Sequence, residues 1–286
     1  PESLLRFQRL DIWKYEPLFK KADKALMNLF PSGNEKFAKE VETVLDELSS
    51  LHIYFELLRL VWRSRLAQAK EKNYENSVRL LPHKELSQMP SNLAQIQKQL
   101  WNLFSHVLDI DRGKEPVRER MAQYYAAHGR DTLETFQFET IPVSFELIDE
   151  HTFAETLYPK DIYAGINFQL RECVRQQVKL RICKNCGQYF AISGKANAEY
   201  CELTLDEKGR SCREFGAIHL WNQKRAEDDV FKVYRREYKK RFAWIKAGRI
   251  DPQSFYAWSE EARRKKAQCE KGEISLEGFA EWLRES

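Results

Sequence analysis

The chain has 286 residues, of which 43% are hydrophobic and 31% are charged, and its formal net charge is +4. This balance predicts a folded protein of two or three domains and excludes a wholly disordered chain. No run of about 18 apolar residues occurs, so the sequence predicts no membrane-spanning helix. The six cysteines are too sparse for a disulfide scaffold, and the small net charge does not by itself indicate a nucleic-acid partner.

Residues 1–130 are predicted to form a helical domain. Asn34 is a candidate N-cap, and apolar residues recur behind it at helical spacing. The prolines and polar residues over 81–90 indicate a connection, after which Ser91 is expected to cap a long amphipathic helix. The other helices of this domain are expected over 34–48, 51–62 and 116–127.

Residues 131–178 are predicted to form a mixed α/β segment. Two runs in which apolar and polar residues alternate, 136–140 and 143–147, predict two short strands or one bent strand. A helix is then expected over 161–177, and a short strand over 178–182 leads directly into a pair of cysteines.

Four cysteines follow, with Cys183 and Cys186 in a C-x-x-C pair and Cys201 and Cys212 further along the chain. Two thiolates on a tight turn and two from a later segment can complete a tetrahedron around Zn²⁺. The pattern therefore predicts a metal-binding module over 179–226, of the zinc-ribbon or treble-clef type. Because four thiolates leave no open position for water, the predicted role of the zinc is structural and not catalytic.

Three other interpretations of these cysteines stay open. They could be four unrelated thiols, the C-x-x-C pair could be a redox motif, or His219 could replace one cysteine as a ligand. The remaining cysteines, Cys173 and Cys269, are expected to be inert thiols of the core. A thiolate site requires a reducing compartment, so the expected location is the cytoplasm.

The segment from Leu180 to Lys224 resembles the bacterial CGNR-type zinc fingers. That family has a cysteine pair, an aromatic and turn segment, a Tyr/Trp-Cys step and a fourth cysteine that opens a basic helix. The segment also resembles an uncharacterised group of bacterial proteins with the same cysteine knuckle and a helical tail. The resemblance implies that Cys183, Cys186, Cys201 and Cys212 are metal ligands. Here Cys-Arg-Glu-Phe, from Cys212 on, stands where the family has Cys-Gly-Asn-Arg.

Residues 227–286 are predicted to form a basic helical tail. An amphipathic helix is expected over 228–245, with aromatic residues on one face and lysine and arginine on the others. A concentration of positive charge beside a zinc module is suited to contact phosphates, and the alternative is a solvated helix face. The predicted nucleic-acid contacts are Arg213, Lys224, Arg225, Lys232, Arg235, Arg236, Lys239 and Lys240.

The tail also contains an internal repeat with the pattern G-x-I-[DS]-x-x-x-F-x-x-W, at 248–258 and again at 272–282. In each copy the glycine is expected to end one helix and Asp251 or Ser275 to cap the next. The repeat therefore predicts short helices that pack on one another, as in a plain helical bundle or a helix-turn-helix reader of DNA.

The sequence as a whole predicts a mainly α fold with a small β element. The predicted function is that of a zinc-stabilised nucleic-acid-binding protein, and a bacterial transcriptional regulator is its expected form. The alternative is a protein-interaction or assembly module with a purely structural zinc site, which would bind a protein partner or form a homo-oligomer. None of the common nucleotide-binding or hydrolase motifs occurs, so no enzyme is predicted, although an unrecognised site in the helical half is a third alternative.

Overall fold

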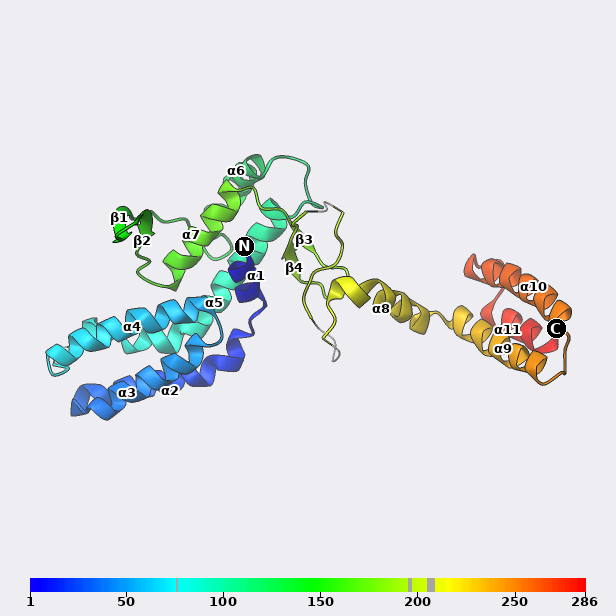
Figure 1. The fold of residues 1–286 in the computed structure, drawn as a ribbon, viewed down its shortest axis with the longest axis horizontal. Coiled ribbons are helices and arrows are strands. Elements are labelled where there is room, and N and C mark those ends of the chain that lie inside the picture. The colour runs from blue at the N-terminus through cyan, green and yellow to red at the C-terminus, as the bar shows by residue number, and fades with distance from the viewer. Residues whose placement is uncertain (76, 195–196, 205–208) are drawn as a thin grey trace. The chain divides into compact units, whose positions relative to one another are not determined.

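The structure is a computed structural model that describes residues 1–75, 77–194, 197–204 and 209–286. Within these residues the chain is mainly α-helical and has two antiparallel sheets of two strands each, so the predicted fold class is confirmed (Figure 1). The chain forms two compact units. The first consists of residues 1–183 and 187–199, and the second of residues 184–186 and 200–286.

The first unit is built on long helices, among which α3 packs between α2 and α4, while α5 packs on α2 (Figure 1). Asn34 caps α3 as predicted, since its Oδ1 accepts a hydrogen bond of 2.9 Å from the main-chain N–H of Lys36. Fully buried residues such as Phe19, Phe55 and Trp62 form the core. The helices are α1 (Glu2–Arg9), η1 (Ile12–Tyr15), α2 (Glu16–Ser32), α3 (Glu35–Ser49), α4 (Ile53–Glu71), η2 (Ser77–Arg79), α5 (His83–Leu103), η3 (Phe104–Leu108), α6 (Val117–His128) and α7 (Ile162–Arg175).

The connection predicted over 81–90 and the cap predicted at Ser91 are wrong, because α5 begins at His83 and continues through Pro90. Pro90 cannot donate the main-chain hydrogen bond of its position. Its ring is buried instead, together with Met89 and Leu86, so the apolar face of the helix starts more than one turn earlier than expected. The burial of these side chains offsets the lost hydrogen bond. At its other end α5 passes into η3, a π-helix.

The strand predicted over 136–140 is also wrong, since this segment has no regular structure. Phe136 is fully buried and its ring stacks on that of Tyr163 at 4.7 Å. The main-chain carbonyls of Phe136 and Gln137 accept hydrogen bonds from the hydroxyls of Tyr125 and Tyr163. Side-chain donors thus satisfy groups that a neighbouring strand would otherwise have paired.

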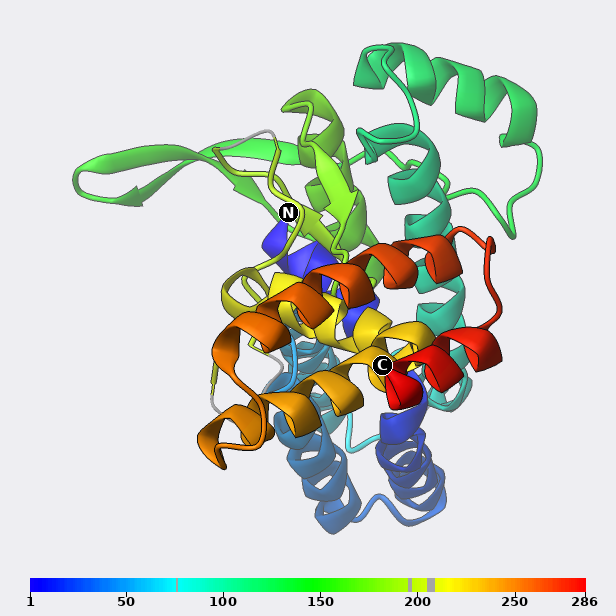
Figure 2. The same ribbon diagram turned by 90° about the vertical axis from the view of Figure 1, so that its right-hand side faces the viewer.

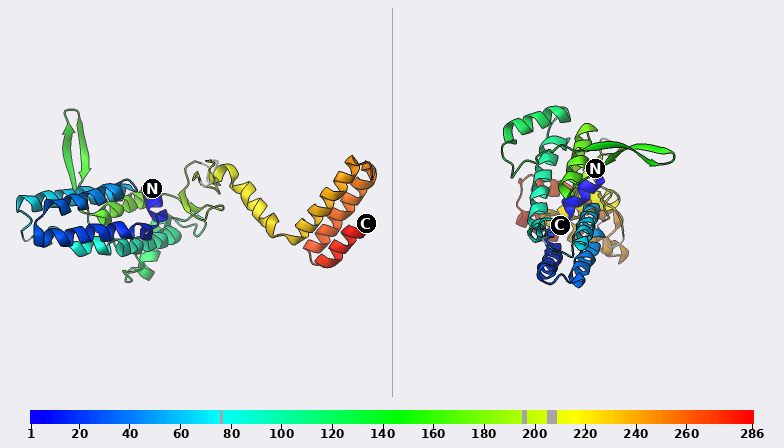
Figure 3. Two further views of the ribbon diagram at one scale, coloured as in Figure 1. Left: turned by 90° about the horizontal axis from the view of Figure 1, so that it is seen from below. Right: turned by 90° about the vertical axis from the view of Figure 1, so that its left-hand side faces the viewer.

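The second alternating run does form a strand. It is β1 (Val143–Asp149), which pairs with β2 (Thr152–Leu157) in an antiparallel hairpin. The hairpin projects from the helices of its own unit (Figure 3). The sequence pattern did not predict β2.

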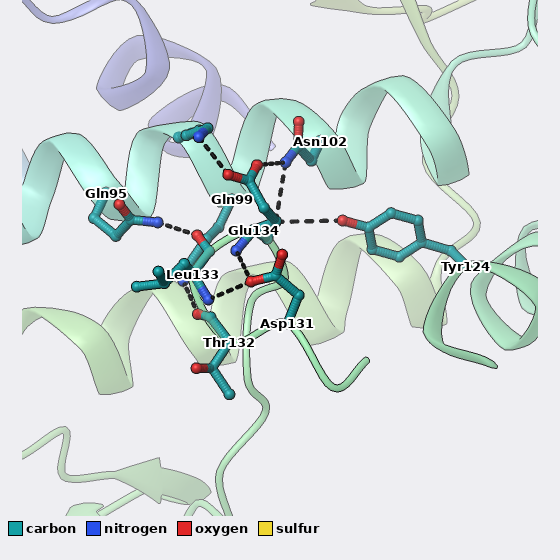
Figure 4. Close-up of polar contacts among 9 residues, drawn as sticks. Gln95, Gln99, Asn102, Tyr124, Asp131, Thr132, Leu133 and Glu134 are labelled. Carbon is teal, nitrogen blue, oxygen red and sulfur yellow. Dashed lines mark hydrogen bonds and ion pairs between the residues drawn. The ribbon is translucent and has the colours of Figure 1, made fainter. Parts of the chain in front are cut away.

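Side-chain amides of α5 hold the segment 131–134 against that helix (Figure 4). Gln99 Nε2 donates to the carbonyl oxygen of Thr132 at 2.9 Å, and Asn102 Nδ2 donates to that of Glu134 at 3.0 Å. Gln95 donates in the same way to the carbonyl oxygen of Leu133. These three acceptors are main-chain atoms, and the Glu134 carboxylate adds side-chain contacts with Asn102 at 3.0 Å and with Lys98, so both the path of the segment and one of its side chains hold it in place.

A second hairpin, β3 (Leu180–Ile182) with β4 (Tyr189–Ala191), confirms the strand predicted before the first cysteine. It is anchored on the residues that follow η3. The main-chain N–H of Ile110 donates to the carbonyl oxygen of Leu180 at 3.1 Å. The Arg181 guanidinium forms a two-bond ion pair with the Asp111 carboxylate, at 2.7 and 2.9 Å.

The second unit contains α8 (Cys212–Glu227), α9 (Asp229–Lys246), α10 (Pro252–Glu270) and α11 (Leu276–Glu285). Helices α9, α10 and α11 pack around Phe255, Trp258 and Phe279 (Figure 2). Both caps predicted from the repeat are confirmed. Asp251 Oδ1 accepts from the N–H of Ser254 at 2.9 Å, and Ser275 Oγ accepts from that of Gly278 at 3.0 Å. In the described part of the chain, no helix has the length and apolar character needed to cross a bilayer.

Candidate metal centre

The first two cysteines lie on the tight turn between β3 and β4. The N–H of Cys183 donates to the carbonyl oxygen of Gln188, and the N–H of Gly187 donates to that of Cys183, both at 2.9 Å. Gly187 has a φ of +71°, a left-handed conformation that side chains disfavour. The glycine therefore lets the chain reverse sharply enough to bring Cys186 beside Cys183.

The other two cysteines are brought together by main-chain pairing of their own segments. The N–H of Cys212 donates to the carbonyl oxygen of Leu203, and the N–H of Arg213 donates to that of Cys201, each at 2.9 Å. Cys212 is also the first residue of α8, whose N-cap is Ser211 in a capping box with Glu214. The start of the helix therefore fixes the position of the fourth sulfur.

The four sulfur atoms of Cys183, Cys186, Cys201 and Cys212 all lie within 4.8 Å of one another. The sulfurs of Cys186 and Cys201 are 3.6 Å apart, and none of the four cysteines forms a disulfide. A tetrahedral site with Zn–S bonds of about 2.3 Å would place its sulfurs about 3.8 Å apart. Three of the four cysteines are buried, so this set of donors could hold a metal ion.

Asn185, the second variable residue of the C-x-x-C pair, connects this centre to α8. Its Nδ2 donates to the sulfur of Cys212 at 3.2 Å, and its Oδ1 lies 2.7 Å from Nδ1 of His219. Since the amide nitrogen is used toward the sulfur, the His219 ring donates to the amide oxygen. Asn185 stabilises negative charge on the sulfur, and His219 orients Asn185. Sequence reasoning missed this role of Asn185, because a residue between two cysteines carries no separate signal.

Gly216 provides a close approach between α8 and the knuckle. A Cβ atom at this position would lie 2.7 Å from Cδ1 of Tyr200 and 3.0 Å from Cβ of Asn185. Real Cβ atoms do not come this close to a neighbour, so only glycine fits without movement of the chain. The glycine therefore allows the first turn of α8 to pack on the segment that carries the cysteines.

The structure places six of the eight predicted nucleic-acid contacts at exposed positions, five of them on α9 and Arg213 on α8. Arg213 is paired with Glu202 at 2.6 Å, and Lys232 with Asp229 at 2.7 Å. Lys240 contacts the buried carboxylate of Glu237 at 3.1 Å. The side chains of Lys224 and Arg225 lie outside the described part of the structure. The six described residues are Arg213, Lys232, Arg235, Arg236, Lys239 and Lys240.

The fold and the cysteine cluster define a mainly α-helical protein with a four-cysteine centre that could hold a metal ion. Residues 132–285, more than half of the chain, match a family described as a family of unknown function (DUF6076). The chain belongs to that family. Its match includes all four cysteines and the helical tail. No curated protein and no solved structure matches the chain.

Proposed function

We propose that this chain is a zinc-stabilised nucleic-acid-binding protein of the CGNR-like type that acts as a transcriptional regulator. The observation that carries the proposal is the cluster of four cysteine sulfurs at the start of α8, followed along the chain by the basic helix α9. The cysteines would hold the metal, and α9 would contact phosphates.

Zinc is the metal that best suits these donors. Thiolates favour Zn²⁺ among the common divalent ions, and a buried set of four is typical of structural sites. The protein purified under reducing conditions should contain one equivalent of zinc by elemental analysis. A Cys201→Ser variant should lose most of it, whereas Cys269→Ser, a cysteine outside the cluster, should retain it. A wild-type protein without a stoichiometric metal would contradict this part of the proposal.

The charge of α9 favours a polyanionic partner. Its exposed basic residues Lys232, Arg235, Arg236 and Lys239 recur every three or four positions, so they lie along one side of the helix. One of the helix's two acidic residues, Glu237, is only 5% exposed. The exposed surface of α9 is therefore strongly positive, and each phosphate that it neutralises would release counterions.

Fluorescence anisotropy with labelled duplex and single-stranded oligonucleotides, measured over a range of salt concentrations, tests this part. The affinity should fall steeply with salt, by a slope of about 0.9 for each phosphate contacted on duplex DNA. Replacement of Arg235, Arg236, Lys239 and Lys240 by glutamine should weaken binding and reduce that slope. The matched control replaces four exposed lysines of α2 and α3 in the first unit and should bind as the wild type does. These lysines are Lys20, Lys21, Lys24 and Lys36. No binding at low salt would refute the proposal.

The β1–β2 hairpin favours the second candidate, a protein-interaction module. Phe145, Leu147 and Phe153 are between 62 and 67% exposed, and the two phenyl rings contact each other at 5.1 Å. A two-stranded hairpin alone is only marginally stable, so a partner that covers this face would stabilise it. The hairpin segment 143–158 contains four acidic residues and neither lysine nor arginine, which suits a partner with a basic and apolar surface. A Phe145→Ser, Leu147→Ser variant should lose such a partner yet bind nucleic acid as before.

A further inference from the structure

A polar cavity of about 220 Å³ lies in the first unit, where the end of η3 faces α6. It is smaller than the pockets that take drug-sized ligands, so its size suits a small anion or a single functional group of a larger molecule. Two arginines and two histidines make up half of its lining, and Glu115 is the carboxylate among the described lining residues. The residues that carry the argument are His106, Arg112, Glu115, Arg120, Tyr124 and His128.

Arg120 is the unusual residue of this cavity. Its side chain is only 7% exposed, and its Nη1 donates to the main-chain carbonyl of Asp109. Its Nε is buried, and nothing in the described part of the chain accepts a hydrogen bond from it. Nor does any described carboxylate form an ion pair with this guanidinium. Asp109 and Glu115 attract this buried charge without forming an ion pair with it, and a buried donor without an acceptor is costly, so an anion from outside would satisfy the unused Nε. Consistent with this, burial lowers the pKa of Arg120 in spite of the nearby acidic groups.

The surrounding structure holds this guanidinium in place. A Cβ atom at Gly113 would lie 2.8 Å from Cδ of Arg120 and 3.3 Å from its Nη1, so the absence of a side chain there makes room for the arginine. Arg112 is positioned at the rim, where its Nη1 donates to the buried hydroxyl of Ser105 at 2.8 Å. The π-helix η3 contributes His106, and such helical irregularities are frequent at functional sites.

Two imidazoles complete the donor set. The ring of His106 stacks on Tyr124 at 5.3 Å and lies 6.0 Å from the ring of His128. Burial, together with His128 and Arg112, lowers the pKa of His106, so an anion in the cavity would reverse part of that effect.

We propose that this cavity is a binding site for a phosphate group. Arg120 would provide the buried donor, Arg112 a second guanidinium at the rim, and the two histidines further N–H donors. The phosphate could be free or could be the terminal phosphate of a nucleic acid. This inference does not depend on the proposed function of α9, because every residue that carries it belongs to the first unit.

Calorimetric titration of the full-length protein with inorganic phosphate, in a phosphate-free buffer of low ionic strength, tests the site. Wild type should bind one equivalent. Arg112→Gln, a change at an exposed residue, should weaken binding about tenfold or more, and Glu115→Gln should strengthen it because a negative charge is removed. Arg118→Gln, a change at an exposed position of α6 that does not line the cavity, should leave phosphate binding unchanged.

Two further measurements sharpen the result. Arg120→Met replaces the unpaired charge by an apolar side chain of similar length, so the variant should be as stable as wild type without phosphate and should gain no stability from it. A 5′-phosphorylated dinucleotide should compete with phosphate if the natural ligand is a nucleic-acid end, whereas failure to compete would assign the site to free phosphate or a small phosphate ester. The proposal is overturned if wild type shows no saturable binding or if Arg112→Gln and Arg118→Gln bind phosphate equally well.

Discussion

The close approach at Gly216 gives the sharpest test of how α8 is joined to the cysteine-bearing segment. Alanine is a better helix former than glycine by about 0.8–1 kcal/mol, so Gly216→Ala would stabilise an unobstructed helix. Here the added methyl group would lie 2.7 Å from the Tyr200 ring and 3.0 Å from Cβ of Asn185. Overpacking of this kind costs about 1–3 kcal/mol. Because Cβ of Asn185 is attached to the main chain, it cannot move aside by a change of rotamer.

We therefore expect a net destabilisation of up to about 2 kcal/mol that is local to α8. Amide hydrogen exchange over 212–220 should become faster, by up to roughly thirtyfold, since 1.36 kcal/mol corresponds to a factor of ten. The displacement of Asn185 should also weaken its hydrogen bond to the Cys212 sulfur and lower zinc affinity, as measured by competition with a chromogenic chelator.

The matched control is Gly278→Ala in α11. A Cβ atom there would have one neighbour within 4 Å, the hydroxyl oxygen of the N-cap Ser275 at 3.2 Å, and the third position of a capped helix commonly carries a side chain beside its cap. This variant should leave exchange in α11 unchanged or slow it slightly. If Gly216→Ala behaved in the same way and retained full zinc affinity, the contact between α8 and the knuckle would not have the tight packing inferred here.

Three further changes have defined outcomes. Asn185→Ala should lower zinc affinity about ten- to a hundredfold in chelator competition with little change in helix content, because it removes a donor to the sulfur and no ligand. Tyr189→Phe should lower the free energy of unfolding in urea by about 1–3 kcal/mol, since the tyrosine hydroxyl donates at 3.0 Å to the buried Asp109 carboxylate. Burial lowers the pKa of His52 below its usual 6.5, so the unfolded chain binds more protons below that pH than the folded chain does. Stability should therefore be fully retained above about pH 6.5 and fall at lower pH, and the fall between pH 7.5 and 5.5 should be shallower in His52→Asn.

Local signals in the sequence were enough to place most of the helices. Asn34, Asp251 and Ser275 were each recognised as caps, and each accepts the expected hydrogen bond from the main chain. A cap is satisfied within three residues of itself, so its signal does not depend on the rest of the fold. The cysteines are also predictable from local sequence, because a C-x-x-C pair followed by two further cysteines is a spacing typical of metal sites.

The errors fall where distant contacts decide the outcome. The sequence predicts that Pro90 belongs to a connection, yet Pro90 is buried in the first unit and lies inside α5. Phe136 lies in a segment whose apolar and polar residues alternate as in a strand. The Tyr125 hydroxyl donates to its main-chain carbonyl and the Tyr163 ring stacks on its ring, so no second strand is needed to pair with it. Tyr125 and Tyr163 lie 11 and 27 residues from Phe136 along the chain, so a local pattern around Phe136 does not include them. Such cases show tertiary packing overriding local propensity.

The residues of the two candidate sites also divide into those that local sequence predicts and those that only tertiary contacts reveal. The sulfur ligands could be proposed from spacing, but Asn185 and Gly216 matter only because α8 folds back onto the knuckle. The cavity around Arg120 had no signal at all, since it depends on a π-helix and on a glycine that leaves space for one side chain.

The contacts around the four cysteines also indicate what a bound metal would contribute. The β3–β4 hairpin has anchors of its own, among them the Arg181–Asp111 ion pair and the hydrogen bond from Tyr189 to Asp109. Around Cys201 and Cys212 the described contacts include short main-chain pairing, the Arg213–Glu202 ion pair and the capping box of α8. A metal with these two sulfurs among its ligands would add a constraint at the first residue of α8, so its removal should loosen the start of that helix.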